Sequence, residues 1–139
     1  MTVTTAETAV RDVIEELTEA MREMDADRVA ACHRPGAVVY ELAPPLGKTF
    51  DPEQQRAWFA EKGGGSMDYE IRDVEIEMAG DLAVAYGLTR MGDGATFDLW
   101  YRSTLVLREI DGRWLIVHAH ESTPFHMDGS LRAAVDLTP

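Results

Sequence analysis

Residues 97–121 read FDLWYRSTLVLREIDGRWLIVHAHE, and this stretch indicates how the chain folds. Two runs in which apolar and polar residues alternate lie on either side of Asp111-Gly112, a dipeptide that is typical of tight turns. Alternation with a period of two is the pattern of a strand that buries one face. The stretch therefore predicts a long β-hairpin with strands over residues 97–108 and 113–121.

The length of the hairpin loop decides which side chains share a face. A two-residue loop pairs Leu105 with His118, whereas a three-residue loop with Gly112 in the left-handed conformation pairs Leu105 with Val117. The second choice separates apolar from mixed side chains better, so we expect the three-residue loop. The face turned to the core then carries Tyr101, Ser103, Leu105, Leu107, Leu115, Val117, Ala119 and Glu121. The opposite face carries Trp100, Arg102, Thr104, Val106, Trp114, Ile116, His118 and His120.

The chain before the hairpin changes from helical to strand periodicity near residue 65. A capping box at Thr4-Thr5-Ala6-Glu7 and an apolar stripe at spacings of three and four predict a first helix that reaches Met24. Asp25 and Asp51-Pro52-Glu53 are start signals for two shorter helices, the first through His33 and the second ending in Gly63-Gly64-Gly65. Further strands are expected over residues 37–42, 67–78 and 82–91. The second of these changes phase near Arg72-Asp73, which indicates a β-bulge.

This order predicts an α+β fold, with three N-terminal helices packed on one face of a curved, mostly antiparallel sheet. A chain of 139 residues fits one domain, so we assign residues 1–139 to it, with residues 122–139 as a C-terminal tail.

Composition narrows the classes of function. The formal net charge is −12, which disfavours nucleic acid and anionic membranes as partners. There is one cysteine, no apolar run of membrane-spanning length, and no signal-peptide pattern at the N-terminus. We therefore expect a cytoplasmic protein that binds a small molecule or another protein.

The mixed face of the hairpin is too apolar for open solvent, so we expect a homodimer through it. The expected interface residues are Trp100, Arg102, Thr104, Trp114, His118 and His120. In the chosen register Arg102 lies opposite His120, where its charge would oppose a metal ion bound by the His118–His120 pair. We expect no metal and no cofactor, and a buried structural role for Cys32.

The hairpin also carries a resemblance. The pattern W-x-R-x-T over residues 100–104, followed by DG-x-W-x-I-x-H-x-H-x-S-x-P-F over residues 111–125, resembles the SnoaL-like and ketosteroid-isomerase-like members of the NTF2-like superfamily. It is also similar to the association domain of calcium/calmodulin-dependent kinases. The resemblance implies a cone in which the sheet wraps a pocket closed by the helices, while the outer sheet face makes a dimer.

The resemblance also implies where a site would lie. Pocket residues would be Tyr40, Trp58, Tyr101, Ser103, Leu105, Val117, Ala119 and Glu121. Ketosteroid isomerases use a carboxylate base on the first strand, and Glu41 is its counterpart here, although strand phase could instead turn Tyr40 inward. Leu17 and Ser103 stand where those enzymes place their oxyanion donors, which argues against steroid isomerisation because losing one donor costs about 10²–10³ in rate.

These expectations leave two functions open. The first is binding of a small apolar, polyketide-like or steroid-like molecule, with proton transfer of the isomerase or cyclase type. The alternative is a non-catalytic dimerisation or association module with a vestigial pocket.

Overall fold

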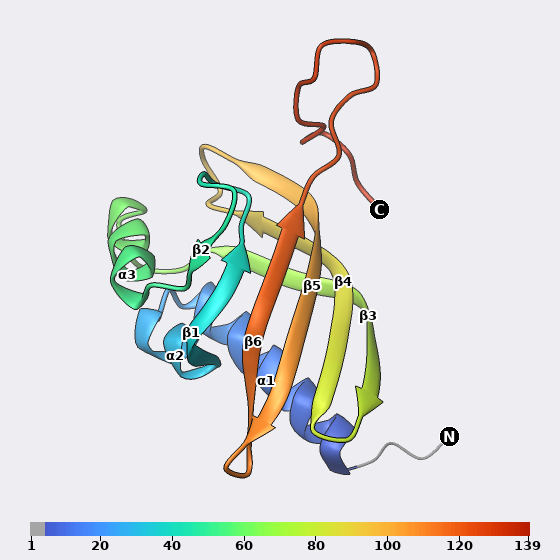
Figure 1. Ribbon diagram of the computed structural model, residues 1–139. Coiled ribbons are helices and arrows are strands. Elements are labelled where there is room, and N and C mark those ends of the chain that lie inside the picture. The colour runs from blue at the N-terminus through green and yellow to red at the C-terminus, as the bar shows by residue number, and fades with distance from the viewer. Residues whose placement is uncertain (1–4) are drawn as a thin grey trace.

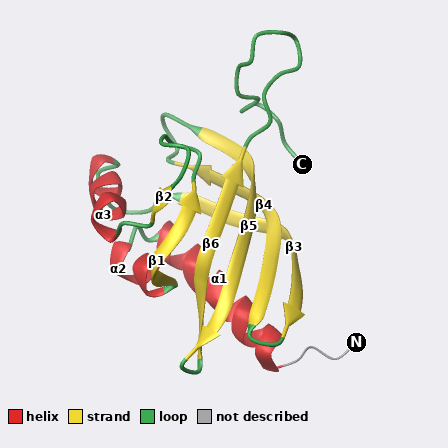
Figure 2. Ribbon diagram, viewed as in Figure 1, coloured by secondary structure: helices red, strands yellow, loops and turns green. Residues whose placement is uncertain are grey.

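The computed structural model describes residues 5–139 as three helices and one six-stranded sheet (Figures 1 and 2). The helices are α1 (Thr5–Arg22), α2 (Ala26–Ala31) and α3 (Pro52–Glu61). The strands are β1 (His33–Tyr40), β2 (Lys48–Thr49), β3 (Asp68–Ala79), β4 (Leu82–Gly92), β5 (Asp98–Ile110) and β6 (Arg113–Ser122). Thr4, the expected start of the capping box, lies outside the described residues.

The strand order is β2-β1-β6-β5-β4-β3, and β1–β6 is the one parallel pair in this sheet. The sheet curves, and α1 runs along one of its faces (Figure 2). The expected α+β fold with a mostly antiparallel curved sheet is thus confirmed. The expectation of three N-terminal helices holds only in part, because α3 follows β1 and β2 and α2 has six residues.

Helix α1 buries the apolar stripe that its sequence predicts. Val10, Ile14, Leu17 and Met21 are buried against the sheet, and Ala20 fills the stripe between them. The opposite face of the helix is acidic. This amphipathic pattern places α1 between the sheet and solvent, where it forms one wall of the interior.

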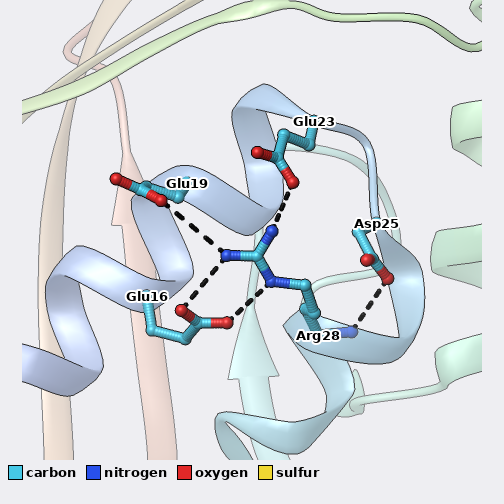
Figure 3. Close-up of polar contacts among 5 residues, drawn as sticks. All are labelled: Glu16, Glu19, Glu23, Asp25 and Arg28. Carbon is cyan, nitrogen blue, oxygen red and sulfur yellow. Dashed lines mark hydrogen bonds and ion pairs between the residues drawn. The ribbon is translucent and has the colours of Figure 1, made fainter.

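An ion-pair cluster on the surface ties α2 to α1 (Figure 3). The Arg28 guanidinium donates to Glu16 across 2.7 Å and also to Glu23, and it lies 3.9 Å from Glu19. The side chain of Asp25 caps α2 by accepting from the Arg28 backbone N–H at 3.1 Å. Hydrogen bonding to Glu16 is the main reason that the pKa of Arg28 is raised.

Strand β3 contains the expected bulge. Its register against β4 shifts between Arg72 and Glu75, and Asp73 takes a positive φ of 58°. The change of phase lets Tyr69 and Ile71 face the interior at one end of the strand, as the sequence pattern predicts.

The hairpin register differs from our prediction. Ile110 pairs with Arg113, so the loop has two residues, and both Asp111 and Gly112 have positive φ. This conformation is the type I′ turn that Asp-Gly favours. A register shift at Val117 then pairs Leu105 with Ala119 and Ser103 with Glu121, which neither of the two expected loops would give.

Relative to the expected register, the two-residue loop and the bulge together change the positions of four side chains. Trp114 and Ile116 are buried, at 6% and 0% exposure, and belong to the core, so Trp114 was wrongly assigned to an outer dimer face. Val117 occupies the bulge instead of the interior, and Leu115 pairs with Arg108 on the outer face. The error arose because we assumed one unbroken alternation along residues 113–121.

The tail after β6 projects from the end of the sheet (Figure 1). It folds back on itself through a bridge between Phe125 and Ala133, and His126 lies 3.2 Å from Asp136. Several apolar tail residues are exposed, namely Phe125, Met127, Leu131, Val135 and Leu137. Over residues 5–139, no helix has the length and apolar character needed to span a membrane.

Candidate functional site

A cavity of about 280 Å³ lies inside the fold, and side chains from the sheet and from all three helices line it. Six of the eight expected pocket residues line it: Trp58, Tyr101, Ser103, Leu105, Ala119 and Glu121. Glu41, the expected base, also lines it. Val117 does not, because the bulge turns it away.

The phase of β1 decides between Tyr40 and Glu41. Ala37 and Val39 are buried at 0% and 2% exposure, so odd-numbered positions face the interior and Glu41 follows them into the cavity. Tyr40 is 41% exposed, and its ring makes edge contacts with His118 and His120 on the outer face. Tyr40 is therefore not a cavity residue, contrary to our expectation.

Glu41 forms an ion pair inside the cavity. Its carboxylate lies 2.8 Å from the Lys48 ammonium, and both side chains are about three-quarters buried, at 29% and 23% exposure. Lys48 reaches this position because β2 pairs antiparallel with β1, with Lys48 opposite Val39. Lys48 Nζ also donates to the side chain of Gln54 on α3 at 3.1 Å.

Glu121 is a carboxyl group of the cavity whose pKa is strongly shifted by its surroundings. Burial is the main cause that raises its pKa to about 7, and the charge of Glu41 adds to the effect. A hydrogen bond with the Tyr101 hydroxyl and the charge of Lys48 act in the opposite direction. The Tyr101 hydroxyl is also hydrogen-bonded to Tyr69, and burial raises the pKa of both phenols. Near neutral pH this end of the cavity thus holds a carboxyl group that can carry a proton, linked to two phenols.

His33 faces the same cavity, a placement that sequence reasoning missed. Its Nδ1 lies 2.8 Å from the Val29 carbonyl oxygen, and its ring stacks on Phe50 with centroids 4.1 Å apart. Burial is the main cause that lowers the pKa of His33. The neighbouring Cys32 is buried in the core, as expected, and burial raises its pKa to about 11.

Two positions singled out by the resemblance carry no strong donor. Leu17 lines the cavity from α1, and the Ser103 hydroxyl is 2.7 Å from the Thr89 hydroxyl, to which it is hydrogen-bonded. The stronger donors are Tyr69, Tyr101 and protonated Glu121. The sequence held a signal for Tyr69: it alternates with Met67 and Ile71 on one face of a strand, and that face turns to the cavity, where Tyr69 and Ile71 line the wall.

Lys62 links the C-terminal end of helix α3 to the loop between β4 and β5. Lys62 follows α3, and its ammonium lies 4.8 Å from the Phe97 ring centre, 5.7 Å from that of Trp58 and 3.5 Å from the Asp93 carboxylate. Cation–π and ionic contacts of this kind hold Trp58 against the loop between β4 and β5. Trp58 is thereby fixed in the cavity wall.

The outer face keeps most of its expected residues. Arg102, Thr104, His118 and His120 lie there, although Arg102 pairs with Ser122 and it is Thr104 that pairs with His120. The guanidinium of Arg72 covers the Trp100 ring at 4.6 Å. Across the described part of the chain, no three His, Cys, Asp or Glu side chains converge on a common metal-binding position.

Comparisons with known proteins agree with this architecture. The family profile of the SnoaL-like domain matches residues 10–126. An NTF2-like protein of unknown function from Pseudomonas putida KT2440 has a TM-score of 0.85 and 29% identity, with both chains fully covered. No functionally curated protein is matched.

Two more distant structures carry functional descriptions. A proposed ketosteroid isomerase from Shewanella frigidimarina has a TM-score of 0.67 and 21% identity, covering 85% of this chain and 98% of its own. The CaMKII hub of S. rosetta has a TM-score of 0.68 and 22% identity, covering 88% and 98%. At these identities the likeness concerns the fold alone. Because the family profile spans most of the chain, this protein belongs to the SnoaL-like domain family and has the NTF2-like fold.

Proposed function

We propose that the cavity binds a small apolar or amphipathic molecule and transfers a proton on it, as an isomerase or cyclase does. The observation that carries this proposal is the contrast between two carboxyl groups in one cavity. Glu41 is paired with Lys48 at 2.8 Å, whereas Glu121 has its pKa raised to about 7. A carboxyl group that titrates near neutral pH, in the same cavity as a carboxylate held in an ion pair, suits acid–base chemistry.

The two ends of the cavity have different tasks in this proposal. Glu121 holds a proton at neutral pH and donates it, or a hydrogen bond, to oxygen on the ligand. The hydroxyl of Tyr101 stays beside it and stabilises the carboxylate that forms when the proton leaves. Glu41 supplies negative charge on the side of the cavity where a proton is removed.

The lining indicates the character of the ligand. Apolar side chains make up much of it, including Met21, Val39, Phe50, Ile71 and Met91. A cavity of about 280 Å³ suits a compact molecule better than an extended chain. The lining carries the carboxyl groups of Glu41 and Glu121 but only one ammonium group, that of Lys48. This balance of charge disfavours an anionic ligand.

A general probe of proton abstraction tests the proposal without knowledge of the natural ligand. A base takes the ring C–H proton of 5-nitrobenzisoxazole, the C–H electrons form the nitrile, and the N–O bond breaks to give a coloured phenolate. We expect ring opening to be faster with the protein than in buffer by about 10²-fold or more. Ala119→Leu, which fills the cavity, should remove most of this rate, and the exposed-face variant Glu77→Gln should not. Ring opening no faster than in buffer would overturn proton transfer as the function.

An association module is the second candidate, and one observation favours it. The outer sheet face exposes Val38, Tyr40 and Tyr86 at about two-fifths each, beside His118 and His120. Large apolar side chains grouped on a sheet face are typical of an interface. A homodimer through this face is compatible with either function. A dimer that has no activity toward the probe would favour association alone.

A further inference from the structure

His33 lines the cavity, and one of its two ring nitrogens has no hydrogen-bond partner among residues 5–139. His33 Nδ1 is engaged by the Val29 carbonyl, and among the described residues Nε2 makes no hydrogen bond or ion pair. In the same part of the chain, no buried side-chain nitrogen or oxygen atom is left without a hydrogen bond. His33 Nε2 is therefore an accessible nitrogen in a residue that lines the cavity.

The hydrogen bond to Val29 fixes which nitrogen carries the proton. A carbonyl oxygen can only accept, so Nδ1 must donate and must hold the hydrogen of the neutral ring. The Nε2 lone pair is then free. Stacking on Phe50 at an interplanar angle of 1° and pairing of His33 with Ile116 on β6 hold the ring in this orientation.

We propose that His33 Nε2 is the atom that accepts the proton from the bound molecule, with Glu41 acting on it through charge and Glu121 as the acid. This inference rests on the proposed function and names a catalytic residue for it. The molecule would lose a proton to Nε2 and receive one from Glu121, so the net charge of the cavity groups is unchanged at the end of the transfer. No oxidant or cofactor is required for such a step.

Electrostatics favours His33 over Glu41 as the acceptor. A proton placed on Glu41 would leave the Lys48 ammonium, 2.8 Å away, without its counter-charge in a largely buried position. A proton placed on His33 creates an imidazolium that the charge of Glu41 stabilises. The lone pairs of the Glu41 carboxylate are also partly occupied by Lys48, whereas Nε2 has no competing partner.

The other charged groups around the cavity do not change this choice. Asp51, Glu41 and Glu121 are the acidic residues of the lining, and Lys48 is the one lysine or arginine in it. Asp51 uses its carboxylate to cap α3 by accepting from the Glu53 backbone N–H at 2.9 Å. Burial keeps His33 neutral at physiological pH, which is the state that an acceptor needs.

The first test needs no substrate. Long-range ¹H–¹⁵N correlation of the His33 ring at pH 7.5 should show a protonated Nδ1 and a bare Nε2, and titration should give a pKa below the ordinary 6.5. A hydrogen on Nε2 instead would overturn the proposal.

The second test uses ring opening of 5-nitrobenzisoxazole. His33→Asn keeps an amide donor near the Val29 carbonyl but has no Nε2, so the rate at pH 7.5 should fall by about 10²-fold or more. His33→Gln, which restores the reach of the side chain without its basicity, should not recover it. The wild-type rate should fall as pH drops through the pKa of His33. Glu41→Gln should move that limb to lower pH and reduce the rate only severalfold, because it removes a charge that raises this pKa.

The outcomes separate the two proposals. If Glu41→Gln abolishes ring opening while His33→Asn retains it, Glu41 is the acceptor and this inference fails although the proposed function stands. If the wild-type protein itself does not accelerate the reaction, the proposed function fails. Loss of folding in His33→Asn, detected by circular dichroism, would leave the decision to the tautomer measurement and to the Glu41→Gln profile.

Discussion

Glu41 and Glu121 face the same cavity from neighbouring parallel strands, each one residue beyond the pair formed by Tyr40 and His120. Parallel strands lie about 4.8 Å apart, so the negative charge of Glu41 is close enough to raise the pKa of Glu121. Lys48 neutralises Glu41, and Tyr101 hydrogen-bonds to Glu121. The protein thus distinguishes two chemically identical groups by giving each a different partner.

The coupling between these groups predicts opposite effects of two substitutions. Glu41→Gln removes a negative charge that raises the pKa of Glu121, so this pKa should fall below about 7. Lys48→Met removes a positive charge that lowers it, so the pKa should rise above about 7. Carboxyl ¹³C titration, with Glu121→Gln for assignment, measures both changes. A shift in the same direction for both variants would contradict the coupling.

The raised pKa of Glu121 also predicts how stability depends on pH. The folded protein holds this proton up to about pH 7, whereas the unfolded chain releases it near the ordinary value of about 4.3. Between these values the folded state binds more protons, so the free energy of unfolding should fall as pH rises through this window. The total decrease is at most about 4 kcal/mol. Urea unfolding from about pH 4.5 to about pH 8, a range that spans the two pKa values, measures this change. Wild type should show the decrease, and Glu121→Gln should not. The exposed-face variant Glu77→Gln should behave like wild type.

The corrected hairpin register predicts that Trp114 stabilises the fold and not a dimer. Trp114 is 6% exposed within the core, so Trp114→Ala should reduce the free energy of unfolding by about 3–5 kcal/mol. The variant's association state, measured by sedimentation under conditions where it remains folded, should match wild type. Weaker association with unchanged stability would support the uniform alternation that the structure replaced.

The outer face predicts a homodimer that depends on Tyr40. Its ring lies against His118 and His120 at centroid distances of 4.8 and 5.4 Å and remains 41% exposed. Tyr40→Glu should weaken association by about 2 kcal/mol or more if this ring is a central anchor. Sedimentation equilibrium measures the change, with exposed Glu77→Gln on β3 as the control. A wild-type protein that is monomeric at micromolar concentration would contradict the prediction.

Much of the fold is determined locally by the sequence. The apolar stripe of α1, the caps at Asp25 and Asp51 and the phase change near Asp73 each predict their element, because each signal depends on residues close together in the chain. The same holds for the inward direction of Tyr101, Ser103 and Leu105, which follows from strict alternation along β5. The family followed from the pattern of residues 100–125.

The tertiary structure decided which groups meet in the cavity. The two-residue loop and the bulge at Val117 together reverse the expected faces of Trp114 and Ile116. The alternation of apolar residues did not reveal this, because both registers that we compared assume an unbroken strand. The pairing of Lys48 with Glu41 depends on a two-residue strand, and the position of His33 depends on an irregular pairing of β1 with β6. Proton affinity depends on burial and on charges brought together from distant parts of the chain. The sequence therefore predicted a cavity that carries carboxyl groups, whereas only the folded arrangement decided that burial raises the pKa of Glu121 to about 7 and that His33 lines the same cavity.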